Sequence, residues 1–333
     1  MIDSVSMSLQ IHIPSSELTK PKWKKLPSKS DYQPAYLHRE NDVIIKYFPH
    51  THTLRIRGKI IRLVSNSSIK NFDDIYGTDR EAFINDINAS INRLFKTISV
   101  DIREFTVSRI DYCFNVRTPF VKEYLDFMTG AFNAVNTGVR KNFAYERDKS
   151  GSVYVKTKSD YENNRNTNYV LNFYDKEDWL NNKKKERVKF SQEDVDYTQG
   201  IFRLEIQAYS KCIKSIEKKH RVSRTFENLF SFEIAQATLE DVYRKVFKAG
   251  IEHEFYKYAS AKQIAESPRA KEVLQRSAEH HQVTSQEYSY IVKQIKNSGI
   301  YPYYFLPKSF ELDVLPSPLW LIKDKIQQLH NQS

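Results

Sequence analysis

The sequence contains few cysteines, few glycines and no long apolar run. Its two cysteines, Cys113 and Cys212, cannot form a disulfide framework or a four-ligand zinc site, so we expect a reducing compartment. The 8 glycines and 11 prolines among 333 residues exclude a collagen-like or low-complexity chain. The first residues do not resemble a signal peptide, and no stretch of about 18 residues is continuously apolar. We therefore expect a soluble, cytoplasmic protein with no membrane partner.

Positive charge is what the chain has in excess. Lysine and arginine number 52 against 41 aspartates and glutamates, which leaves a net charge of +11 at pH 7 and a pI near 9.3. Such a surplus attracts polyanions, so nucleic acid is the first partner that we expect. Hydrophobic residues make up 40% of the chain, which is enough for a folded core.

Short runs of β-branched and aromatic residues dominate the first two thirds of the chain. They predict strands, which mostly form an antiparallel sheet. A polar segment between residues 157 and 168 is expected to be a turn or loop. The predicted strands are 43–48, 53–58, 60–64, 105–116, 152–157, 168–176 and 201–207.

Helical periodicity replaces the strand pattern from about residue 211 onward. One earlier helix is expected after the capping box of Thr78 and Glu81, and another at 120–135. The later predicted helices are 211–220, 226–249, 260–280, 284–298 and 317–330. We therefore predict an α+β protein, with a mostly antiparallel sheet and flanking helices in a domain over 1–215. A helical C-terminal region over 216–333 follows it.

Three of the predicted strands carry polar residues at every second position. They contain Arg109-Ile110-Asp111, Asn172 to Glu177, and Arg203-Leu204-Glu205. If one sheet face is buried, the other gathers carboxylates, cations and a phenol. Phosphodiester chemistry uses these groups: carboxylates bind a divalent cation, arginine or lysine neutralises phosphate charge, and a tyrosine oxygen can attack phosphorus. The same alternation also fits a solvated face with cross-strand ion pairs, and the pattern alone leaves both interpretations open.

The segments around these strands resemble a family of replication proteins. Three segments are similar in order and spacing to segments of the filamentous-phage replication endonucleases, the gene II proteins. They are FTVSRIDYCFNVRTP, NYVLNFYDKEDW and FRLEIQAYSKCIKS. They also resemble the Rep_trans initiators of rolling-circle plasmids and related relaxases of integrative conjugative elements. The resemblance covers about residues 40–220.

The resemblance implies a strand-specific nick in origin DNA inside a bacterial host, through a 5′-phosphotyrosine intermediate that leaves a 3′ hydroxyl. Tyr174 matches the attacking tyrosine, and we expect the nearby Lys176 to favour its phenolate form as a catalytic residue. Asp111 and Glu205 match the acidic positions, which we assign to Mg²⁺ or Mn²⁺. The resemblance also implies supporting roles for Arg109 and Arg203 beside them and for Glu177 as a further ligand.

Basic residues beyond the nucleophile segment are expected to hold DNA phosphates on either side of the cleaved bond. For each of them a solvated helix surface is the alternative. They are Lys183, Lys184, Lys185, Arg187, Lys189, Lys214, Lys218 and Lys219.

Two other functions remain open at this point. One is a conjugative relaxase that nicks a transfer origin, and the other is a DNA-binding regulator whose polar face does not react. A host helicase as an additional partner, and the oligomeric state, are also left open.

Overall fold

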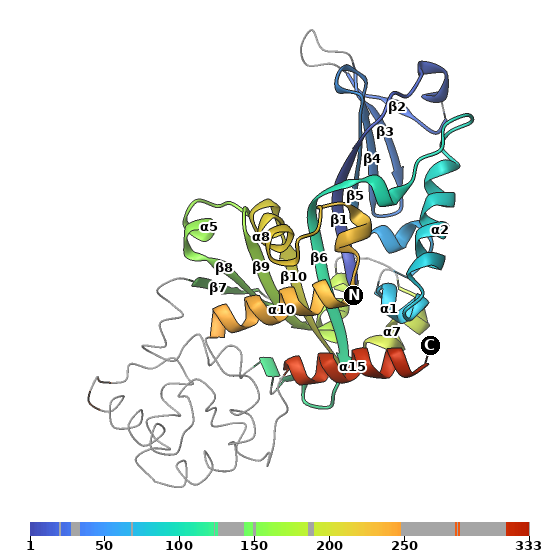
Figure 1. Cartoon of the computed structure of the whole chain (residues 1–333). Coiled ribbons are helices and arrows are strands. Elements are labelled where there is room, and N and C mark those ends of the chain that lie inside the picture. The colour runs from blue at the N-terminus through green and yellow to red at the C-terminus, as the bar shows by residue number, and fades with distance from the viewer. Residues whose placement is uncertain are drawn as a thin grey trace.

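The fold is known from a computed structural model, which describes residues 1–19, 21–27, 34–67, 69–122, 124–125, 143–148, 151–185, 190–247, 284, 286 and 318–332. Its centre is one antiparallel sheet of ten strands, in the order β2-β3-β4-β5-β1-β6-β10-β9-β8-β7 (Figure 1). From one edge to the other these are β2 (Lys24–Lys25), β3 (Tyr36–Glu40), β4 (Val43–Phe48), β5 (Thr53–Gly58), β1 (Ile2–Gln10), β6 (Thr106–Arg117), β10 (Ile201–Ala208), β9 (Tyr169–Asp175), β8 (Val153–Thr157) and β7 (Phe143–Arg147). The predicted α+β class with an antiparallel sheet is confirmed.

One face of the sheet is apolar because every second residue of its strands is hydrophobic. Phe114, Leu204, Phe173 and Val153 lie side by side on four neighbouring strands, and all four are buried. We call this the apolar face and its opposite the polar face. The helices that contribute apolar side chains to the same cluster include α2 (Arg80–Asn92), α8 (Ser210–His220), α9 (Phe226–Leu229) and α10 (Phe232–Phe247).

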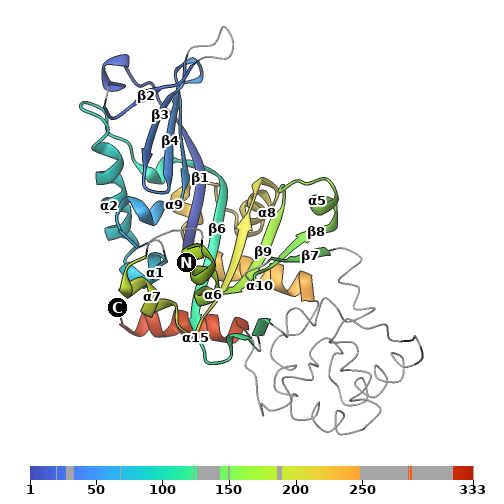
Figure 2. The same cartoon turned by 180° about the vertical axis from the view of Figure 1, so that it is seen from behind.

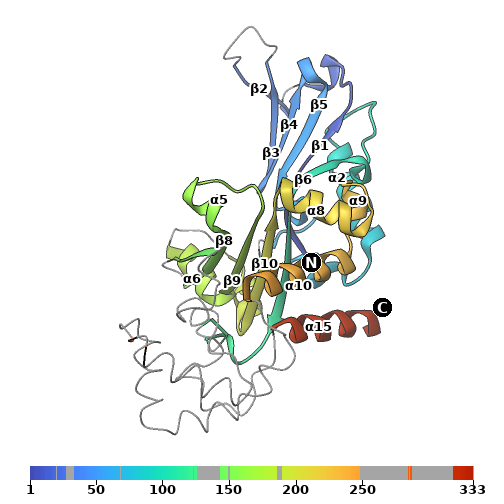
Figure 3. The ribbon, with the colours of Figure 1, turned by 60° about the vertical axis from the view of Figure 1, so that its left-hand side comes forward.

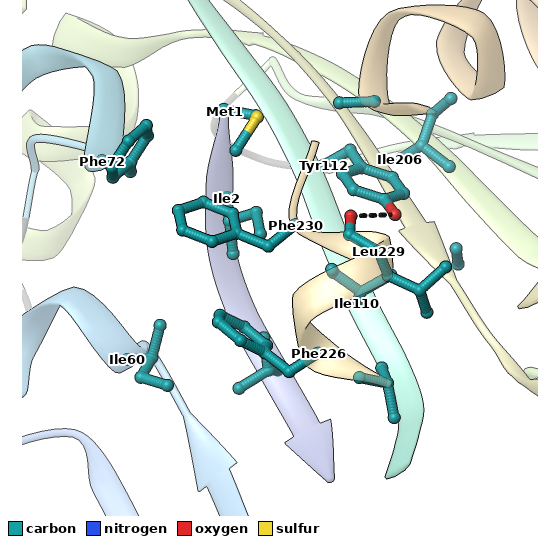
Figure 4. Packing of buried hydrophobic residues seen from close by; sticks show 14 of the residues in the cluster. Met1, Ile2, Ile60, Phe72, Ile110, Tyr112, Ile206, Phe226, Leu229 and Phe230 are labelled. Carbon is teal, nitrogen blue, oxygen red and sulfur yellow. Dashed lines mark hydrogen bonds between the residues drawn. The ribbon is translucent and has the colours of Figure 1, made fainter. Parts of the chain in front are cut away.

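Aromatic side chains join the helices to the central strands. Phe230, between α9 and α10, lies 4.8 Å from Phe72 and 5.2 Å from Phe83 between ring centroids. Tyr112 of β6 donates a 2.8 Å hydrogen bond to the carbonyl of Leu229, so its hydroxyl is satisfied inside the core (Figure 4). These contacts pack the helices against the apolar face, so the polar residues of the strands lie on the opposite face.

The remaining helices include two that follow β9 in the chain. These are α6 (Lys176–Lys185) and α7 (Gln192–Thr198), which contact each other and lie at the same end of the molecule (Figure 2). The others are α1 (Phe72–Tyr76), α5 (Lys158–Glu162) and α15 (Pro318–Gln332), and the short 3-10 helices are η1 (Ser15–Glu17), η2 (Pro49–Thr51), η3 (Ile60–Leu63) and η4 (Ile102–Glu104).

Several predicted elements have different bounds in the structure. Residues 60–64 do not form a strand: Ile60, Ile61 and Leu63 belong to η3 and are buried. The β-branched residues at these positions favour a strand, but here their side chains are buried by a 3-10 turn instead. The N-cap of α2 is Asp79 and not the predicted Thr78, because the Asp79 side chain accepts from the Ala82 N–H.

Two other helices begin at positions that differ from the prediction, because a side chain caps the new helix start. The predicted helix 226–249 is two helices, since the Ser231 hydroxyl accepts from the Ile234 N–H and starts α10 anew. The polar segment after residue 157 begins with α5, where Thr157 caps the Asp160 N–H. The predicted helix 260–280, and most of 120–135 and 284–298, lie outside the described residues.

The domain division near residue 215 stays a prediction. In the described part of the chain, α8, α10 and α15 contribute apolar side chains to the same cluster as the sheet.

Truncation of Phe230 should destabilise the fold. Its ring contacts Phe72, Phe83 and Phe226, so Phe230→Ala leaves a cavity among three aromatic rings. We expect a loss of about 3–5 kcal/mol in the free energy of unfolding, measured by urea denaturation. Ile75→Ala, at a side chain that is 40% exposed, is the control and should stay within about 0.5 kcal/mol of the wild type. Equal losses for both variants would contradict this account of the core.

Candidate active site

The three predicted polar segments meet on adjacent strands of the sheet. Arg203 of β10 is the register partner of Tyr174 on β9, and Gln207 is the partner of Asp111 on β6. Glu205, between Arg203 and Gln207 on the same face, is paired with Asn172. Since paired residues of an antiparallel sheet point to the same side, the polar groups share one face. The strand alternation therefore predicted which residues gather.

Arg203 is the centre of this polar face. It is 1% exposed, and its guanidinium donates to Glu205 Oε2 at 2.9 and 3.1 Å and to Asn71 Oδ1 at 3.0 Å. Its Nη2 also lies 2.9 Å from Asp3 Oδ1. A buried guanidinium needs such partners because an unpaired buried charge is very costly. Arg203 therefore binds strand β1 and the start of α1 to the middle of the sheet.

Arg109 and Asp111 form a second ion pair along β6. Arg109 donates to both carboxylate oxygens of Asp111, at 2.6 and 2.7 Å, in a bidentate arrangement. Burial raises the pKa of Asp111 to about 7 despite this arginine, and the negative charges of Glu205 and Asp3 contribute to the rise. Burial is thus the main reason why the Asp111 carboxyl holds its proton more firmly than an ordinary aspartate does.

Tyr174 lies between the side chains of Lys176 and Arg203. Its ring centroid is 5.5 Å from Lys176 Nζ and 5.8 Å from the guanidinium carbon of Arg203. The side chain is only 5% exposed, and burial raises the pKa of its phenol well above the usual value of 10. The surroundings are charged, but a phosphodiester reaches this phenol only if side chains packed over it move.

Lys176 has the properties of a proton acceptor. It is 2% exposed, and burial together with the charges of Arg203 and Lys59 holds the pKa of its amine well below the usual range. Its position follows from the chain, since β9 ends at Asp175 and α6 begins at the next residue. The Asp175 carboxylate accepts from the Glu177 N–H at 2.8 Å and caps this helix.

Several residues of the site were missed by the strand pattern. Asp3 of β1 lies 2.9 Å from Lys59 Nζ. Burial opposes its ionisation, but the positive charges of Lys59 and Arg203 hold the pKa of Asp3 well below its usual value. A signal for β1 exists, because Val5, Met7 and Leu9 alternate with Ser4, Ser6 and Ser8.

Gln207 and Tyr209 extend the site toward the surface. Gln207 donates to Glu205 Oε1 at 3.0 Å, and the Tyr209 hydroxyl donates to Gln207 Oε1 at 3.0 Å. The Arg109 guanidinium lies 5.0 Å from the Tyr209 ring centroid. Tyr209 is half-buried, so this end of the polar face reaches solvent.

Other predicted site residues lie apart from this cluster. Glu177 is exposed in the first turn of α6, past the end of the strand. Lys214, Lys218 and Lys219 are on α8, whose buried residues contribute to the core of the apolar face, and Lys219 pairs with Asp241. These three lysines and the acidic residues thus lie on opposite sides of the sheet.

The first group of predicted DNA-binding residues lies partly on α6, the helix that begins at the site. Lys183, Lys184 and Lys185 form the last turn of α6, the helix that begins with Lys176. Arg187 and Lys189 lie outside the described residues.

The oxygen atoms near Arg203 are of the kind that Mg²⁺ and Mn²⁺ prefer. Asp111 and Glu205 supply carboxylates, and the buried Asn172 Oδ1 has no hydrogen-bond partner. Both carboxylates are held by arginines, however, and no three His, Cys, Asp or Glu side chains within the described ranges converge as a metal-binding group. The donor chemistry suits a divalent cation if these arginines release the carboxylates.

The chain matches no protein-family model, and neither a curated protein nor a solved structure is significantly similar to it. Within the described residues, every helix is too short or too polar to cross a bilayer.

The raised pKa of Asp111 predicts a pH-dependent stability. The folded protein keeps a proton on Asp111 up to about pH 7, whereas the unfolded chain releases it near pH 3.8. The contribution of this group to the free energy of unfolding therefore falls as the pH rises from about 4 to about 7. Asp111→Asn has no proton to lose, so its stability relative to the wild type should be higher at pH 8 than at pH 5.

Urea denaturation in EDTA buffers at the two pH values measures this difference. The exposed Asp178→Asn is the control, with the same relative stability at both pH values. A pH-independent difference for Asp111→Asn would show that Asp111 is already ionised at pH 5.

Proposed function

We propose that the protein is a metal-dependent DNA nicking and joining enzyme that initiates rolling-circle replication. The observation that carries this proposal is the convergence of Tyr174, Arg203, Glu205 and Asp111 on one face of three adjacent strands. The resemblance of the same segments to replication endonucleases supports it. The net charge of +11 suits a DNA substrate.

In the proposed reaction the Tyr174 oxygen attacks a backbone phosphorus. The bond between phosphorus and the 3′ oxygen breaks, the tyrosine keeps the 5′ phosphate, and the departing oxygen takes up a proton to become a 3′ hydroxyl. Lys176 accepts the phenol proton, a role that its lowered pKa supports. Religation is the reverse of these steps.

Arg203 and Arg109 neutralise the charge that builds up on the phosphate. Asp111 and Glu205 would hold the Mg²⁺ or Mn²⁺ ion, which supplies Lewis-acid polarisation of the phosphoryl oxygens. DNA phosphates compete with the carboxylates for the two arginines, so substrate binding frees the carboxylates for the cation.

Tyr174→Phe should abolish nicking and leave DNA binding intact, because it removes one oxygen atom. The assay uses a supercoiled plasmid carrying the DNA that adjoins the chain's own gene, with Mg²⁺, and follows open circles and the covalent protein–DNA adduct. Tyr161→Phe, at a side chain that is 48% exposed, is the matched control and should nick normally. Normal nicking by Tyr174→Phe would assign the nucleophile elsewhere.

Divalent cations should be required for the reaction. EDTA is expected to stop nicking, and added Mn²⁺ to restore it. Asp111→Asn and Glu205→Gln should each need a higher Mn²⁺ concentration for half-maximal nicking, because each loses a charged ligand. Unchanged nicking in EDTA would remove the metal from the proposal while leaving the tyrosine chemistry intact.

The burial of Tyr174 favours one second candidate, a DNA-binding regulator on the same fold. A phenol that is 5% exposed and whose pKa is raised does not react without rearrangement. Such a regulator would bind the plasmid but form neither open circles nor an adduct. A relaxase acting at a transfer origin would use the same chemistry, so the DNA segment that is nicked distinguishes it.

A further inference from the structure

Basic side chains continue the polar face from the candidate site across the N-terminal half of the sheet. Arg109 on β6 is paired with Ser6 on β1, Ser6 with Arg57 on β5, Arg57 with Ile44 on β4, and Ile44 with Arg39 on β3. A parallel row pairs Ser8 with Arg55 and Arg55 with Lys46. We call Arg39, Lys46, Arg55 and Arg57 the basic strip.

The strip lies on the side of the sheet that helices leave open. Ile45 and Ile56, which point to the apolar face, are buried, whereas Arg39, Arg55 and Arg57 are exposed. Figure 3 shows α2 and α9 on one side of the upper strands and no described helix on the other side of β3, β4 and β5. The strip is therefore accessible from the polar face.

The charges of the strip are not neutralised within the described part of the protein. None of the four basic side chains of the strip forms an ion pair with a described acidic side chain. Nearby, Lys59 and Arg62 do form such pairs. Lys46 and Arg55 are direct cross-strand partners. Like charges in that position destabilise a sheet, so a bound anion would relieve a repulsion that the fold maintains.

An aromatic ring accompanies these charges. Phe48 of β4 lies on the same face as Lys46, two residues away, and is partly exposed. The Arg55 guanidinium lies 4.8 Å from its ring centroid. A partly exposed ring beside cations is the combination that holds unpaired bases by stacking and their phosphates by charge.

We propose that the basic strip with Phe48 binds single-stranded DNA and leads it to the candidate active site. From β10 to β4 the sheet spans four strand spacings, about 19 Å, so one extended strand can contact both regions. Arg109 belongs to both, since it pairs with Asp111 and continues the first row. The commitment to DNA rests on the proposed function, whereas the binding surface itself is argued from charge and geometry.

Binding of fluorescein-labelled oligo(dT) to the full chain, followed by anisotropy over a series of salt concentrations, tests this inference. The double variant Arg55→Gln and Arg57→Gln should weaken binding about tenfold at low salt and flatten the slope of log K against log salt by about 1.4, which is two phosphate contacts. Phe48→Leu should weaken binding about tenfold with little change in slope, because it removes stacking only.

The matched control removes two charges from the other side of the sheet. Lys214→Gln with Lys218→Gln on α8 should leave both the affinity and the slope unchanged, since these exposed lysines do not face the strip. The inference is overturned if the control weakens binding as much as the strip variant, or if the wild type prefers duplex DNA to oligo(dT). Folding of each variant is checked by its urea midpoint, which should match that of the wild type.

The test separates this inference from the proposed function. Strip-dependent binding by a protein that never nicks plasmid DNA would sustain the strip and refute the enzyme. Nicking by a strip variant with wild-type oligo(dT) affinity would sustain the enzyme and refute the strip.

Discussion

The buried guanidinium of Arg203 is the interaction on which the arrangement of the polar face depends. Its partners come from three separate parts of the chain: Glu205 two residues away, Asp3 near the N-terminus and Asn71 before α1. Removing water from such a charge is so unfavourable that the fold must deliver all these acceptors together. The N-terminal strand therefore lies in the middle of the sheet, where it joins its two halves.

This ionic network keeps a buried polar face charged. In the proposed reaction the two arginines are already held at the site, but they exchange their carboxylate partners for phosphate oxygens before a cation can bind. The same fixing explains the protonation behaviour: Asp111 is partly protonated near neutral pH, while the amine of Lys176 loses its proton readily. The same polar face thus holds an acid that is difficult to ionise and a lysine that is difficult to protonate, and such shifted pKa values are frequent at functional sites.

The sequence allowed the strands of the site to be predicted, but not the surroundings of the site. Alternation placed Arg109 with Asp111 and Arg203 with Glu205 correctly, because a period of two depends only on local geometry. It could not show that Asp3 joins them, since that contact links the start of the chain to β10. Nor could periodicity show which face of the sheet α8 covers. Its lysines were expected near the DNA because they follow Glu205 closely in the sequence.

The two halves of the sheet differ in what covers their polar face. Around Arg203 the polar face is enclosed, with Tyr174 and Lys176 both nearly inaccessible, which suits chemistry that must exclude water. Toward Arg55 and Arg57 the same face is open and positively charged, which suits capture of a polyanion. Arg109 and Tyr209 lie at the junction, where the enclosed cluster meets solvent. In the proposed binding mode, DNA on the open half would bring its phosphates to this junction, where Arg109, the partner of Asp111, would be the first cation of the enclosed cluster that they meet.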